Sequence, residues 1–177
     1  YKNNLGVALR KVGKLDEAVH IFQQILTSNS ENSAAQNNLG LALAQLGHFS
    51  EAETAYLSAL NTTPNYSNAS LNLADLYTQV TAFEKAKHCL NRAVAHDIDN
   101  SSLLIKLGMV LQKQGRLEEA REILTEALDK KSSESNSSTA LANVLRDLGE
   151  FENAVAILEN LPTRPAEYPK KLANLAL

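Results

Sequence analysis

The chain has 177 residues, of which 44% are apolar, with 17 basic and 20 acidic side chains. This is ordinary for a folded protein, and the formal charge of −3 argues against a general binder of nucleic acid or anionic membrane. One cysteine excludes an internal disulfide framework, and no apolar run approaches the roughly 18 residues of a membrane span. We expect a cytoplasmic location, unless a signal or anchor precedes the first residue.

The expected elements recur every 34 residues along the chain. A leucine keeps this step six times, and a glycine or alanine always follows it. Further on, an alanine recurs in all five units and a turn glycine in four of the five. The leucines are Leu5, Leu39, Leu73, Leu107, Leu141 and Leu175. A fixed period of 20 to 50 residues predicts a stack of repeated units.

The first two units cover residues 1–32, a partial repeat, and 33–66. In the second unit Leu39, Ala42, Leu43 and Leu46 share one face of a helix. Gly47 then permits a turn, and a second helical pattern follows. The small residue after each leucine would let the two helices of a pair approach closely. Each unit is therefore predicted to be a pair of antiparallel helices.

The later units cover residues 67–100, 101–134 and 135–168, and residues 169–177 begin a sixth or capping helix. Thr81 replaces the turn glycine in the third unit, which makes that turn less certain. The serine-rich stretch "DKKSSESNSST" keeps the 34-residue step and suggests a weakly packed junction. The prolines of "LPTRPAEYP" suggest a boundary. We expect ten helices and a partial eleventh, in a piece of a longer protein.

At these residues the chain resembles the tetratricopeptide repeat family. The second unit fills the family pattern with Leu39, Gly40, Leu43, Gly47, Ala52, Tyr56, Ala59 and Pro64. The family's early tryptophan is absent, and its closing proline occurs only once. The resemblance implies an all-α fold, a right-handed α-solenoid of helix pairs. It also implies a protein-protein interaction scaffold that binds an extended peptide or a partner helix in a concave groove.

Asparagine is frequent directly before the repeated leucine, at a position off the buried stripe of the first helix. The residues at this step are Asn4, Asn38, Asn72, Lys106, Ala140 and Asn174. The match is most similar to the O-linked N-acetylglucosamine transferase branch of the family, in which an asparagine ladder holds the backbone of a polypeptide. The alternative is that these are tolerated polar residues on a wet face, bonded to their neighbours.

The other residues expected on the inner face are mostly basic. They are Arg10, Lys11, Lys106, Lys113, Arg146 and Lys170, against Asp75 and Asp147. The candidate peptide-binding residues are therefore Asn4, Asn38, Asn72, Asn174, Lys106, Lys113, Asp75 and Arg146. Such a face favours acidic partner segments. A family clamp for terminal carboxylates is not expected, because Asn3 stands where the clamp needs lysine.

No pattern in the sequence indicates catalysis, a cofactor or a metal. A Gly-rich phosphate loop and a metal-ligand spacing are both missing from the sequence. Cys89 stands at a step that other units fill with isoleucine or alanine, which predicts a core cysteine. We expect a non-enzymatic scaffold with protein or peptide partners. Two alternatives are the substrate-selecting arm of a larger transferase and a solenoid that self-assembles.

Overall fold

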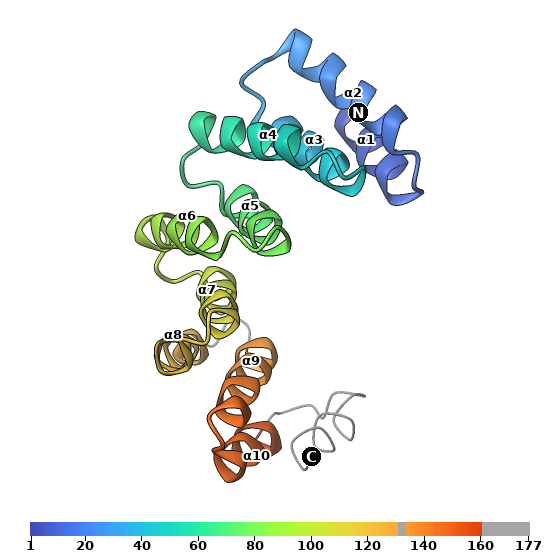
Figure 1. Ribbon diagram of the computed structural model, residues 1–177. Helices are drawn as coiled ribbons and strands as arrows, with labels where there is room; N and C mark the ends of the chain where they lie inside the picture. Colours follow the sequence, from blue (N-terminus) through green and yellow to red (C-terminus); the bar gives the residue numbers. More distant parts are fainter. Residues whose placement is uncertain (131–133, 161–177) are drawn as a thin grey trace. The chain divides into compact units, whose positions relative to one another are not determined.

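The computed structural model describes residues 1–130 and 134–160, which contain ten α-helices and no strand (Figure 1). The helices are α1 (Lys2–Lys11), α2 (Leu15–Ser28), α3 (Ser33–Gln45), α4 (Phe49–Thr62), α5 (Ser67–Gln79), α6 (Phe83–His96), α7 (Ser101–Lys113), α8 (Leu117–Asp129), α9 (Glu134–Asp147) and α10 (Phe151–Glu159). The all-α prediction is confirmed. The expected partial helix at residues 169–177 lies outside the described residues.

The contacts divide the chain into two units, residues 1–89 and 90–177, and the boundary falls inside α6. In the first unit the successive helices from α1 to α5 pack on one another in chain order. In the second unit α7 to α10 do the same. Odd-numbered helices are the first of each pair and even-numbered helices the second. Both units are thus stacks of helix pairs, as the 34-residue period predicts.

The turn inside each pair uses a left-handed residue. Gly13, Gly47, Gly115 and Gly149 have φ between 75° and 83°. Thr81 takes the same kind of conformation in the α5–α6 turn, with φ of 58°. A β-branched side chain is rarely found there, because its Cβ crowds the backbone. The third turn therefore forms without glycine, at a cost in conformational energy.

A close crossing of α3 and α4 explains the small residue after the repeated leucine. A Cβ atom added to Gly40 would lie 2.6 Å from Cε1 of Tyr56. The Tyr56 side chain is only 1% exposed, so its ring has no room to move away. The predicted steric reason for a small residue is confirmed at this crossing.

The first helices form the inner side of each unit. Helix α1 contacts α3, α3 contacts α5, and α7 contacts α9. In the described part of the chain, no comparable contact joins α2 to α4 or α8 to α10. Neighbouring first helices therefore lie closer together than neighbouring second helices. We call the surface of the first helices in each unit its inner face.

Candidate functional site

Two hydrogen bonds between asparagine side chains link the first helices of residues 1–89. Nδ2 of Asn38 in α3 donates to Oδ1 of Asn3 in α1 at 3.1 Å. Nδ2 of Asn72 in α5 donates to Oδ1 of Asn37 in α3 at 2.9 Å. We call these two bonds the asparagine rungs. In each rung, the asparagine directly before a repeated leucine bonds to an asparagine 35 residues earlier, in the preceding first helix.

The rungs leave part of each amide available for another partner. Asn38 and Asn72 are half-buried, whereas Asn37 is only 5% exposed. A primary amide has two N–H donors and an oxygen that can accept two bonds. A rung uses one N–H of Asn38 or Asn72, so the second N–H and the oxygen can still bond. Asn4 is exposed, and Asn174 lies outside the described residues.

A second kind of side-chain bond joins the same helices further along the inner face. Nη1 of Arg10 donates to Oε1 of Gln45 at 3.4 Å, between α1 and α3. In residues 90–177, Nε2 of Gln112 donates to Oδ2 of Asp147 at 2.5 Å, between α7 and α9. These partners are 35 residues apart, as in the asparagine rungs. A polar contact at this offset is therefore a repeated feature of the inner faces.

The charged candidates differ in how their charge is balanced. Nη2 of Arg146 pairs with Oδ1 of Asp147 at 2.7 Å, so the two charges offset each other. Burial disfavours ionisation of Asp147, but hydrogen bonds from Gln112 and Arg146 and the charge of Arg146 outweigh it and lower the carboxyl pKa. Lys106 is half-buried and Lys113 is exposed, both on α7. Asp75 is exposed on α5, and Lys170 lies outside the described residues.

Cys89 in α6 is not fully buried, so it is not the core cysteine that the sequence predicts. Cys89 is half-buried, and its Sγ lies 3.8 Å from the carbonyl oxygen of Ser70. Within the described ranges no group of three histidine, cysteine or acidic side chains could hold a metal ion. In the same ranges no helix has the length and apolar character needed to cross a bilayer.

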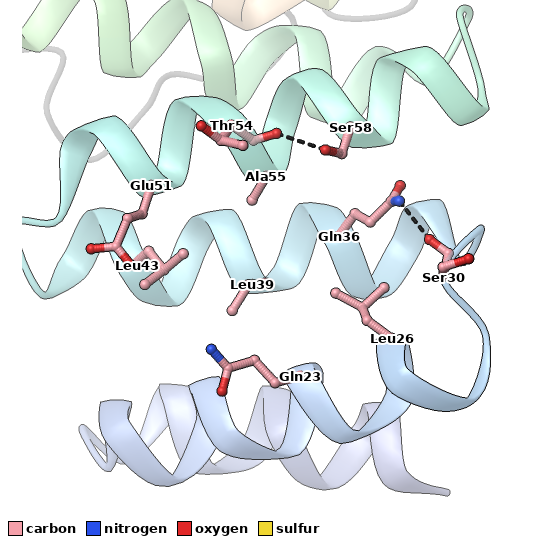
Figure 2. A pocket seen from close by; sticks show the side chains of 10 residues that line it. All are labelled: Gln23, Leu26, Ser30, Gln36, Leu39, Leu43, Glu51, Thr54, Ala55 and Ser58. Carbon is pink, nitrogen blue, oxygen red and sulfur yellow. Dashed lines mark hydrogen bonds between the residues drawn. The ribbon is translucent and has the colours of Figure 1, made fainter.

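A groove also opens on the side of the second helices, between α2, α3 and α4 (Figure 2). Its volume is about 370 Å³, near the lower end of the range for ligand pockets. Apolar residues line most of its floor, and polar residues line its rim. The floor is Leu26, Leu39, Leu43 and Ala55 with the buried Gln36, and the rim is Gln23, Ser30, Glu51, Thr54 and Ser58. We call it the outer groove.

Sequence reasoning missed two features of these surfaces. It treated the asparagines before the leucine as one column and did not assign Asn3 and Asn37 as their partners. The signal was present in the doubled asparagine at residues 3–4 and 37–38. It also overlooked the outer groove, although Leu43 and Tyr77 differ in size at the same repeat step.

Family models described as tetratricopeptide repeat match residues 3–70, 71–136 and 111–175. No curated protein matches the sequence significantly.

Several solved structures share the fold. TTC0263, a thermophilic TPR protein of Thermus thermophilus, is 21% identical with a TM-score of 0.76, over 99% of this chain and 95% of that one. YrrB, a TPR protein with an unusual peptide-binding site, is 18% identical with a TM-score of 0.72, over 99% and 91%. MamA is 19% identical with a TM-score of 0.72, over 99% and 94%. These likenesses concern the fold.

Proposed function

Because the chain belongs to the tetratricopeptide repeat family, a family of protein-interaction scaffolds, we propose that it is a non-catalytic scaffold. Its inner face in residues 1–89 binds an extended peptide. The amides of Asn38 and Asn72 hold the peptide backbone, and exposed Asn4 extends the same column. The asparagine rungs also fit the alternative of structural asparagines bonded to their neighbours, so the observation that carries this proposal is the partial exposure of the Asn38 and Asn72 amides beside the rungs.

The chemistry of an amide suits a peptide backbone. Its remaining N–H can donate to a peptide C=O, and its oxygen can accept from a peptide N–H. Both contacts are independent of the peptide's side chains. Each rung also orients its amide before the peptide arrives, which reduces the ordering cost of binding.

The spacing of the first helices also suits an extended peptide. Packed helices lie about 8–10 Å apart, and an extended chain rises about 3.3 Å per residue. Successive amides on α1, α3 and α5 would then meet the peptide about every third residue. Amides that bond backbone groups favour an extended chain over a helical one, because a helix already pairs its own backbone N–H and C=O groups.

The inner face of residues 90–177 is a separate part of this proposal, in which lysines on α7 favour acidic partners. Lys106 stands at the repeat step of Asn38 and Asn72, and Lys113 lies two turns further along the same helix. Arg146 contributes less, because Asp147 offsets its charge. An acidic residue of the partner would be attracted at a strength that salt reduces.

The asparagine rungs favour one alternative, a substrate-selecting arm that presents a polypeptide to a transferase domain elsewhere in a longer protein. Such an arm needs to hold many substrates, and backbone contacts from amides permit that. Reading the coding sequence on both sides of this segment tests the alternative. A transferase domain in the same reading frame would support it, and an unrelated flanking sequence would oppose it.

The test of the main proposal starts with peptides selected on the chain from a random-sequence display library. The double variant Asn38→Ala and Asn72→Ala should then bind them more weakly. Each lost bond costs about 0.5–1.5 kcal/mol. The double change should thus weaken binding from several-fold to about a hundred-fold, with little dependence on peptide sequence. Isothermal titration calorimetry measures the change.

A matched control separates peptide contact from the stability of the stack. The double variant Asn3→Ala and Asn37→Ala removes the same two rungs but keeps the amides of Asn38 and Asn72. It should lower stability about as much as the first variant and lose only the part of the binding that comes from orienting the amides, which is a smaller loss than in the first variant. Equal losses of binding in the two double variants would contradict a direct contact.

A further inference from the structure

Helices α4, α5 and α6 repeat the arrangement of α2, α3 and α4 one step along the chain. At the 34-residue step, Tyr77 corresponds to Leu43 in the floor of the outer groove, and Lys85 corresponds to Glu51 on its rim. The two places can therefore be compared residue by residue. One has a large aromatic side chain where the other has a smaller aliphatic one.

The Tyr77 ring is held between the second helices on either side of α5. Its hydroxyl donates to Oε1 of Glu53 in α4 at 2.7 Å. Nζ of Lys85 in α6 lies 5.3 Å from the centre of the ring and 3.4 Å from the same Glu53 oxygen. Tyr77 is only 7% exposed. The fold thus packs an aromatic ring, bonded at its hydroxyl and covered by a cation, at this place.

The outer groove has the corresponding helices as walls but lacks the ring, and Val19 stands on α2 at the repeat step of Glu53. Leu43 is 6% exposed, and the space above it remains open, with a volume of about 370 Å³. Figure 2 shows Gln23 on the α2 side of the groove and Glu51 on the α4 side. The wall that carries the cation Lys85 beside Tyr77 carries the anion Glu51 here. Glu51 is exposed, and its Oε1 lies 3.3 Å from Nδ1 of His48.

We propose that the outer groove binds an aromatic side chain of a partner protein, from a segment with a lysine or arginine beside that aromatic residue. The apolar floor matches an aromatic ring, which buries a large area for few rotatable bonds. The Gln23 amide on the α2 wall can bond a tyrosyl hydroxyl. Glu51 on the opposite wall complements the neighbouring cation.

This site is independent of the proposed peptide-binding face. The outer groove is lined by α2, α3 and α4 and contains none of the four rung asparagines. A scaffold with both surfaces could hold two partner segments at once. Failure of either proposal leaves the other standing.

The probe is acetyl-tyrosyl-lysine amide, titrated into the ¹⁵N-labelled full chain and followed by NMR. Backbone amides of Leu39, Leu43 and Ala55 should shift in a saturable way, with a dissociation constant in the millimolar range. Acetyl-alanyl-lysine amide, which lacks the ring, should give at most a tenth of the affinity. The variant Glu51→Gln should weaken the lysine probe about threefold and leave neutral acetyl-tyrosine amide unchanged.

Two variants fill the groove in different ways. Leu43→Tyr copies the residue of the next repeat into the floor and should abolish the shifts. Thr54→Tyr covers the groove from its exposed rim without changing the floor, so it tests the proposal even if Leu43→Tyr does not fold. The proposal is overturned if the wild-type chain shows no saturable shifts at the groove. It is equally overturned if a folded variant with a filled groove binds as the wild type does.

Discussion

The neighbouring pairs α3–α4 and α5–α6 share the asparagine before the repeated leucine on the inner face and differ elsewhere, including at Asn37, which corresponds to Leu71. Asn38 and Asn72 occupy the same step, and each donates to an asparagine of the preceding pair at similar distances. By contrast, three other positions differ between the two pairs. In α3–α4 they hold a leucine, an acidic residue and a turn glycine, and in α5–α6 they hold a tyrosine, a basic residue and a threonine. The replaced residues are Leu43, Glu51 and Gly47, and their counterparts are Tyr77, Lys85 and Thr81.

The difference shows which surface can act across several repeats. A peptide that runs along α1, α3 and α5 meets the same amide chemistry at each helix. The outer side offers a different environment at each pair, which suits a local site such as the outer groove. The asparagine that recurs on the inner face therefore suits recognition of a partner's backbone. The residues that vary on the outer side suit recognition of one partner side chain.

The largest effect is expected where the two pairs differ at the helix crossing, at Gly40 and Ala74. Gly40→Ala should destabilise the chain by about 1–3 kcal/mol, because its Cβ would lie 2.6 Å from the fixed Tyr56 ring. Ala74→Gly should also destabilise, by about 1–2 kcal/mol, through lower helix propensity and the loss of a fully buried methyl group. Urea unfolding measures both. A stabilising Gly40→Ala change would show that the crossing has room for a methyl group.

The next effect concerns Lys106, the first described residue that breaks the asparagine column. Lys106→Ala together with Lys113→Ala should weaken peptides with acidic residues about threefold to tenfold at low salt. The loss should shrink as salt is raised. The loss caused by the Asn38 and Asn72 double variant should not depend on salt. Titration at two ionic strengths tests this, and equal salt dependence for the two double variants would contradict it.

The smallest effect lies in the turns. Thr81→Gly should stabilise the chain by about 0.5–1 kcal/mol, because relief of a strained left-handed residue outweighs the greater freedom of glycine in the unfolded chain. The converse change, Gly47→Thr, should destabilise by a similar amount, since a Cβ there meets no other atom and only the backbone conformation opposes it. Thermal unfolding resolves both signs. If Thr81→Gly destabilises, the threonine side chain contributes more than its conformation costs.

Much of the fold was visible in the sequence because it depends on features within one repeat. The spacing of Leu39, Leu43 and Gly47 predicts a helix, its buried face and its end, and the structure has all three. The Thr81 turn was less certain, because a β-branched residue is intrinsically unfavourable there. The turn is required for α5 to pack against α6, and this packing cannot be predicted from the residues of the turn alone.

The candidate site was harder to predict because it depends on how repeats align with one another. The asparagine column was visible, but the partner of Asn38 was not. Its bond crosses to Asn3, 35 residues away, and this offset follows from the relative shift of α1 and α3. Likewise, the charge of Arg146 is offset because the Asp147 carboxylate pairs with it. The position of that carboxylate depends in turn on its hydrogen bond from Gln112 in α7.

The most direct test of the account is a double-mutant cycle between Asn38 and the backbone of a selected peptide. One arm is Asn38→Ala, and the other replaces single peptide amides by esters along the peptide, which removes one N–H at a time. We predict coupling of about 0.5–1.5 kcal/mol at one or two adjacent peptide positions, and at a position about three residues away for Asn72→Ala. Coupling below the error of the measurement at every position would contradict the claim that these amides hold the peptide backbone.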